Sequence, residues 1–179
     1  WQGGMSLNTT DGLGKKDIPI PDNARIYYLA STQHGPSAVP ETGICQQLSN
    51  PAPHRETLRA LTVALEQWVL SGKLPPASRY PRLSDGTLVR PDAATFGWPK
   101  IPGVNFNGLV NEISLLDFGP GYEARWTSGL LREPPAPTGK KYMTLVPKID
   151  TDGNDVAGVR STTIQAPLGT YTGWNLRAT

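Results

Sequence analysis

The chain has 179 residues, of which 19 are glycine and 18 are proline, so these two types make up about a fifth of it. Charged residues account for 18% and apolar residues for 37%, and the net charge of +2 arises without a long run of like charges. This composition excludes wholesale disorder, a collagen-like repeat and the basic surface of a nucleic-acid-binding protein. No apolar run reaches the roughly 18 residues that cross a bilayer. Many turns and long extended connections are expected.

Residues 1–23 are predicted to form a connecting loop, because Thr10-Asp11-Gly12 and the proline-rich stretch 18–23 are typical of turns and extended chain. The N-terminus lacks the basic and apolar regions of a signal peptide and begins at Trp1, which fits a processed, cleaved or partial polypeptide.

A short strand is predicted at about residues 25–31, where the sequence Arg-Ile-Tyr-Tyr-Leu-Ala-Ser is almost continuously apolar and aromatic. Such a run is typical of a strand covered on both faces in a mostly parallel sheet. His34 follows it directly, and Gly35 lets the chain turn away without crowding the imidazole ring. A histidine on a loop between a buried strand and a helix has the setting of a general base, so His34 is the candidate catalytic residue. A structural or merely exposed histidine is the alternative.

The clearest helix is predicted from about His54 to Ser71, after a proline-containing excursion. Gly72 stands where a left-handed C-cap is expected, and Pro75-Pro76 prevent continuation. An apolar stripe at helical spacing is expected to pack against a sheet, with burial contributing about 1.5–3 kcal/mol for each large side chain. Its members are Leu58, Leu61, Leu65, Trp68 and Val69.

The sequence from 73 to 137 consists mainly of turn signals, and residues 109–116 are compatible with either a short helix or a strand. Near the end, the apolar stretches 142–147 and 156–160 flank Asp150-Thr151-Asp152-Gly153-Asn154. Two short strands around an Asp-Gly turn predict a β-hairpin.

No competent nucleophile precedes His34, since the Gly-x-Ser-x-Gly turn of serine hydrolases is absent. Ser6 and Ser31 are the serines before His34, and neither is predicted to lie at a strand-to-helix turn. A carboxylate that orients the imidazole could come from three aspartates that stand among turn residues, where aspartate is expected for local reasons. They are Asp11, Asp17 and Asp22.

No metal site or cofactor is predicted. Asp150, Asp152 and Asn154 resemble the start of a calcium loop, but Asp155 replaces the required glycine and Ser161 the required glutamate, which favours a hairpin turn. Cys45 is the only cysteine and so forms no internal disulfide, leaving an inert thiol or a bridge to a cysteine elsewhere.

Several stretches together resemble the C-terminal half of a bacterial family of largely uncharacterised, often exported α/β-hydrolase-domain proteins. In chain order these stretches are Arg25-Ile26-Tyr27 with Thr32-Gln33-His34-Gly35, Arg59-Ala60-Leu61 with Ala64-Leu65, Ser78-Arg79-Tyr80-Pro81-Arg82-Leu83 with Asp85-Gly86-Thr87-Leu88-Val89, Asp152-Gly153-Asn154 with Ala157-Gly158, and Pro167-Leu168 with Thr170-Tyr171-Thr172-Gly173-Trp174-Asn175.

The resemblance implies an α/β chain forming the C-terminal portion of an α/β-hydrolase fold: last core strand, histidine loop and C-terminal helix, with a loop-rich extension and a hairpin. Residues 1–72 are then the end of the hydrolase core, and 73–179 a Pro/Gly-rich extension wrapping the same domain. His34 takes the position of the family's catalytic histidine in a serine hydrolase that cleaves carboxylic esters.

The same resemblance places the nucleophile, the oxyanion hole and the triad acid outside this chain. The expected partners are therefore the N-terminal part of the same hydrolase, whether a separate chain or a missing segment, and a small-molecule ester. A secreted or periplasmic location is expected. The alternative function is a non-catalytic extracellular binding module, whose ligand-contacting surface would include Trp98, Trp126, Trp174 and the tyrosines.

Overall fold

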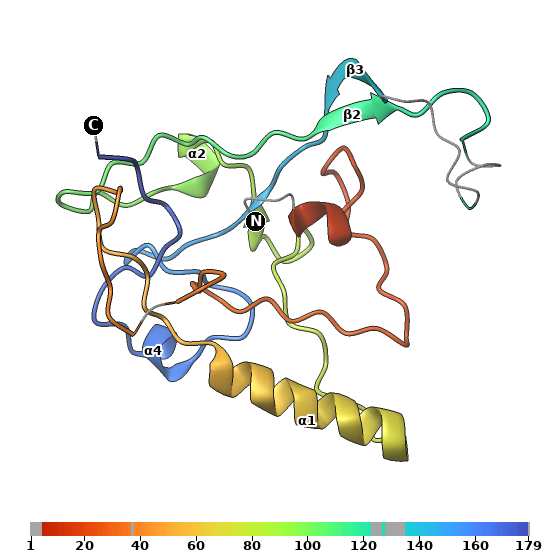
Figure 1. Cartoon of the computed structure of the whole chain (residues 1–179), viewed down its shortest axis with the longest axis horizontal. Coiled ribbons are helices and arrows are strands. Elements are labelled where there is room, and N and C mark those ends of the chain that lie inside the picture. Colours follow the sequence, from red (N-terminus) through yellow and green to blue (C-terminus); the bar gives the residue numbers. More distant parts are fainter. Residues whose placement is uncertain (1–4, 37, 123–126, 128–134, 179) are drawn as a thin grey trace.

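The computed structural model describes residues 5–36, 38–122, 127 and 135–178, which form short regular elements joined by long loops (Figure 1). One long helix, α1 (Arg55–Ser71), projects at one edge of the molecule, and the pair β2 (Ser114–Asp117) and β3 (Ala136–Lys141) projects at the opposite edge. The other elements are short: η1 (Met5–Asn8), β1 (Leu88–Val89), α2 (Ala93–Phe96), β4 (Val146–Pro147) and α4 (Thr162–Gln165). Within these described ranges, no helix has the length and apolar character needed to span a membrane.

The named strands form two small antiparallel sheets instead of the expected covered parallel sheet. In one, Leu88 pairs with Pro147 and Val89 with Val146. In the other, β2 pairs with β3, so the ambiguous stretch 109–116 ends as a strand and not as a helix.

The predicted strand at 25–31 is present only as an extended segment with two isolated parallel bridges, Tyr27 to Arg79 and Leu29 to Val159. Parallel pairing is therefore correct, but a regular strand is not formed by the described residues. The partner around Arg79 is short because Pro76 and Pro81 bracket it, and proline cannot donate to a ladder.

The core is small and aromatic. Phe96, Val146 and Ile149 are buried, and half-buried side chains from several loops pack against them. The Phe106 ring lies 4.9 Å from that of Trp98 in a stacked geometry and 4.6 Å from that of Trp174 edge-on, measured between centroids. Such pairs are favourable beyond their buried area, so these aromatic rings anchor loops that carry little regular structure.

Helix α1 confirms the predicted element and its C-cap, because Gly72 adopts φ 70° and donates its N–H to the carbonyl of Trp68. The predicted burial is wrong for the described residues. None of the helix side chains is buried, and Leu58, Leu65 and Val69 are 46%, 54% and 74% exposed. Trp68 reaches the body of the protein, where the Arg25 guanidinium lies 5.0 Å from its ring centroid.

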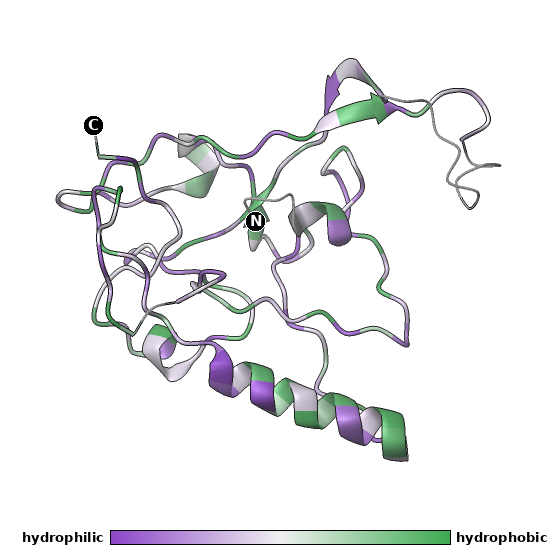
Figure 2. Ribbon diagram, viewed as in Figure 1, coloured by the Kyte–Doolittle hydropathy of each residue, from purple (hydrophilic) through white to green (hydrophobic). Residues whose placement is uncertain are grey.

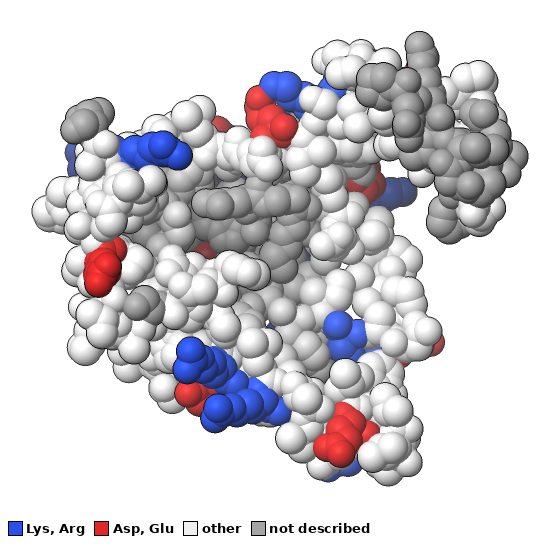
Figure 3. All heavy atoms as spheres, viewed as in Figure 1, with Lys and Arg blue, Asp and Glu red and all other residues white. Residues whose placement is uncertain are grey.

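The surface of α1 is consequently mixed. Figure 2 shows apolar and polar residues interspersed along the helix. Figure 3 shows basic side chains over its first half, whereas much of this face of the protein carries no charge. The apolar stripe that the sequence assigns to a sheet thus lacks a cover in the described chain.

The Asp150–Asn154 turn is confirmed, but its strands pair differently from the prediction. Asp150 accepts hydrogen bonds from the backbone N–H of Asp152 and of Asn154, and Ile149 bridges antiparallel to Asp155. Beyond this bridge the two arms separate, because β4 pairs with β1 while Val159 pairs with the backbone of residues 28–30.

Candidate functional site

His34 lies on an exposed loop that begins three residues earlier, at the buried turn residue Ser31. Among the described residues, none forms a hydrogen bond or an ion pair with the imidazole. Gly35 is equally open, since a Cβ added there would meet nothing within 4 Å. The imidazole ring is therefore accessible to a group from another part of the hydrolase. The loop that carries it follows directly on the extended segment.

Ser31 fixes the direction of the chain before His34. It is 4% exposed and has a positive φ of 53°, an uncommon conformation for a residue with a side chain. Its N–H donates to the Asp155 carboxylate over 2.5 Å, and its Oγ accepts the N–H of Asp155 over 2.7 Å. Its carbonyl accepts from the Asn50 side-chain amide over 2.8 Å. The backbone and side chain of Ser31 are thus held from two directions.

Asp155 is the buried ionisable group of this site. Burial raises the pKa of its carboxyl to about 6, although hydrogen bonds from Tyr28 and Ser31 act in the opposite direction. The Tyr28 hydroxyl donates to the carboxylate over 2.8 Å. Sequence reasoning missed this residue, since the contact joins positions 124 residues apart and Asp155 stood out only as a mismatch to a calcium loop.

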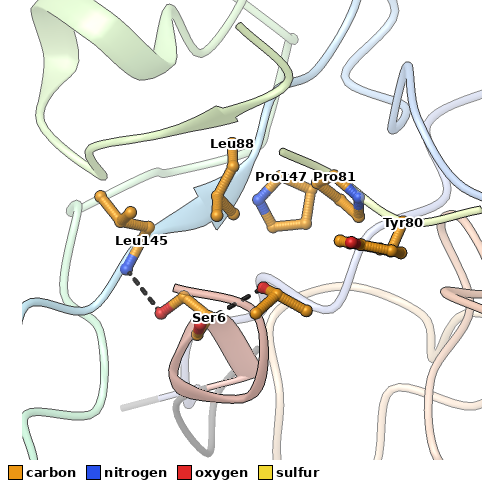
Figure 4. Close-up of a pocket in the computed structure, with 7 residues that line it drawn as sticks. Ser6, Tyr80, Pro81, Leu88, Leu145 and Pro147 are labelled. Atoms are coloured by element: carbon orange, nitrogen blue, oxygen red, sulfur yellow. Dashed lines mark hydrogen bonds between the residues drawn. The ribbon is translucent and has the colours of Figure 1, made fainter. Parts of the chain in front are cut away.

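Neither serine before His34 is available as a nucleophile for it. The Ser31 Oγ accepts from Asp155 in the buried network. Figure 4 shows Ser6 below a small apolar pocket lined by Tyr80, Pro81, Leu88, Leu145 and Pro147. There the Ser6 Oγ accepts the N–H of Leu145 over 3.2 Å, and its carbonyl accepts from Thr9 and Thr10. Both side chains stabilise backbone.

Two of the candidate orienting aspartates, Asp11 and Asp17, accept hydrogen bonds from backbone N–H groups. The carboxylate of Asp11 accepts from the N–H groups of Lys15 and Lys16, which lowers the pKa of Asp11. Burial raises the pKa of Asp17, but hydrogen bonds from the N–H groups of Leu83 and Ser84 lower it by more. The pKa of Asp17 is therefore below its usual value. Asp11 thus closes a local turn, Asp17 ties the N-terminal loop to residues 83–84, and neither bonds to His34.

An uncharged groove of about 310 Å³ adjoins the Ser31 network. Its walls come from the loop around residues 47–51 and the loop around residues 168–174, and Val104 closes one side. Asn50 belongs both to this groove and to the contacts of Ser31. Gln47 and Asn175 join the two walls. The Gln47 N–H donates to the Asn175 side-chain oxygen over 3.0 Å, and the Asn175 amide donates to the Gln47 carbonyl over 2.8 Å.

Two of the three tryptophans that the binding-module hypothesis assigns to a ligand-contacting surface lie in the described part of the chain. Trp98 packs into the aromatic core, and Trp174 does so while also lining the groove. Trp126 lies outside the described residues. The tryptophans that can be assessed thus have loop-anchoring contacts.

Comparison with known proteins agrees with the resemblance seen in the sequence. The sequence model of the alpha/beta hydrolase domain family matches residues 13–179, almost the whole chain. No curated protein and no solved structure gives a significant match. The extent of the family match shows that the chain belongs to the alpha/beta hydrolase domain family.

Proposed function

We propose that the chain provides the catalytic histidine, His34, of a serine hydrolase that cleaves carboxylic esters. Family membership supports hydrolase activity in general. The observation that carries the finer proposal is the exposed imidazole directly after an extended, parallel-paired segment, on a loop whose entry is fixed by a buried carboxylate.

In this mechanism, His34 accepts the proton of the serine hydroxyl as that oxygen attacks the ester carbonyl. It then returns the proton to the departing alcohol oxygen, leaving an acyl-enzyme. A water molecule attacks next, with His34 again accepting and returning a proton, so that serine and a carboxylic acid are formed. General base action of this kind contributes about 10²–10⁴ in rate.

The serine comes, in this proposal, from the N-terminal part of the same hydrolase, and an open backbone edge supports that arrangement. In an extended chain the N–H and C=O groups of alternate residues point to opposite sides. Groups of residues 26, 28 and 30 bond to Arg79 and Val159, whereas no described residue bonds to the N–H of Tyr27 or of Leu29. On the same edge, the Leu29 carbonyl accepts the Thr32 hydroxyl over 2.8 Å. A neighbouring strand fits this edge, next to His34.

The exposed side of α1 supports the same partner. Leu58, Leu65 and Val69 lie on one side of the helix and are uncovered by the described residues. Apolar side chains of this number on one face are typical of a packing surface. The nucleophile-bearing part of the hydrolase would cover it while pairing with the open edge.

The test is hydrolysis of an activated ester, p-nitrophenyl acetate, by the hydrolase that contains this chain. His34→Ala is expected to abolish turnover and leave the thermal unfolding transition in place. His54→Ala is the matched control, because His54 precedes α1 without a side-chain cap bond, and it should retain turnover. Near-normal turnover by His34→Ala would remove His34 from the mechanism. A serine-reactive phosphonate should label no serine within residues 1–179.

A further inference from the structure

The carboxylate of Asp155 is buried, and the ionised form of a buried carboxyl is unfavourable unless its oxygens accept hydrogen bonds. The residue is 5% exposed, and Tyr28 and Ser31 donate to the same carboxylate oxygen. Both donors belong to the extended segment that leads to His34. The side-chain hydrogen bonds of Asp155 thus go to the segment that enters the candidate catalytic loop, while its backbone bridges to Ile149.

We infer that Asp155 is a positioning residue that sets the direction from which the His34 loop leaves the extended segment. The inference rests on the proposed function of His34. Its physical basis is the exchange of hydrogen bonds between Asp155 and Ser31, which ties the N–H and the Oγ of Ser31 to one partner residue. These bonds hold Ser31 at φ 53°, where a residue with a Cβ is otherwise unfavourable.

Releasing Ser31 would redirect the chain three residues before the imidazole. Asn50 would still hold the Ser31 carbonyl, and Val159 would still pair with residues 28–30, so the segment keeps its place while the turn relaxes. Displacement of a catalytic group by about 1 Å costs on the order of 100-fold in rate. The loss is expected in kcat more than in KM, because Asp155 contacts the chain that carries His34.

The experiment compares kcat and KM for p-nitrophenyl acetate across variants of the hydrolase. Asp155→Asn keeps the shape but replaces two charge-assisted hydrogen bonds by weaker neutral ones, so its kcat should fall about tenfold with KM within about twofold. Asp155→Ala should lose about 100-fold in kcat. Asp150→Asn is the matched control, because its carboxylate bonds the 150–154 turn and lies 3.6 Å from the Arg160 guanidinium without contacting Ser31, and its kcat should be unchanged.

Rescue separates positioning from general weakening of the fold. Ser31→Gly removes the Cβ that makes a positive φ unfavourable, so the double variant Asp155→Ala/Ser31→Gly should regain at least about tenfold in kcat over Asp155→Ala. The NMR resonances of the His34 ring should move in Asp155→Asn and stay in place in Asp150→Asn.

The inference is overturned by a folded Asp155→Asn variant with unchanged kcat and unchanged His34 resonances, or by failure of Ser31→Gly to restore kcat to Asp155→Ala. If Asp155→Ala does not fold, Asp155→Asn alone decides between these outcomes. His34→Ala in the same assay keeps the two ideas apart. An inactive His34→Ala beside fully active Asp155 variants refutes only the positioning role, whereas an active His34→Ala refutes the proposed function.

Discussion

Gly158→Ala is expected to be among the most damaging small substitutions in the protein. Gly158 has a φ of 96°, and a Cβ there would lie 2.4 Å from the Tyr28 carbonyl oxygen and 2.7 Å from Tyr28 Cδ1. That carbonyl cannot simply move away, because it accepts the N–H of Val159 over 2.7 Å. Positive φ costs a residue with a Cβ about 1–2 kcal/mol, and overpacking adds about 1–3 kcal/mol. The free energy of unfolding should therefore fall by about 2–5 kcal/mol.

Two other glycines separate the steric part of this cost from the backbone part. Gly72 has a φ of 70° with nothing within 4 Å of an added Cβ, so Gly72→Ala should cost only the backbone part, about 1–2 kcal/mol. Gly169 is open and has no positive φ, and Gly169→Ala should change stability by less than about 0.5 kcal/mol.

The assay is urea unfolding of the whole protein, with the slope against urea fitted for every variant to confirm that compactness is unchanged. The close approach of residues 28 and 158 would be refuted if Gly158→Ala unfolded at the same urea concentration as Gly72→Ala. A midpoint well below both controls is the expected result.

The remaining predictions concern the buried carboxylate and the two uncovered surfaces. Asp155 has a pKa of about 6 in the folded protein against 3.8 in the unfolded chain, so the folded state binds more protons between these values. The free energy of unfolding should fall by about 3 kcal/mol in total as pH rises from about 3 to 7, with about 2 kcal/mol of this lost between pH 4 and 6. Urea unfolding at each pH should show this decline, and it should be missing in Asp155→Asn; a parallel decline in that variant would assign it to other groups. In the complete hydrolase, the amides of Tyr27 and Leu29 should exchange hydrogen as slowly as those of Tyr28 and Ala30, and rapid exchange at the first pair would argue against a strand at the open edge. If the proposed N-terminal part of the hydrolase covers α1, Leu65→Asp should destabilise the assembled protein by more than about 2 kcal/mol, and a neutral effect would mean that α1 faces solvent.

Local signals in the sequence predicted local structure well. The spacing of apolar residues, Gly72 and the prolines at 75 and 76 were sufficient for α1, and the Asp-Gly pair was sufficient for the turn at 150–154. These features depend on contacts between near neighbours along the chain, which a single sequence displays directly.

Pairing across long separations was not predictable in the same way. The run at 25–31 has the apolar character of a full strand, but the structure it forms depends on Arg79 and Val159, each of which makes a single bridge with it. The apolar stripe of α1 indicates that a cover is required, and it contains no information on which residues provide it. The Asp155–Ser31 contact joins residues 124 positions apart and has no local signature.

The groove beside Asn50 lies between irregular loops that a further set of hydrogen bonds ties together. Residues 44–47 hold the tail of the chain through the bridge from Cys45 to Arg177 and through the N–H groups of Gln46 and Ala178. If these bonds between residues 44–46 and 176–178 opened, the groove walls could move apart. The Ser31 turn would keep its conformation, because none of these bonds involves Ser31. Loss of these bonds is thus expected to change the spacing of the groove walls and to leave the Ser31 turn in place.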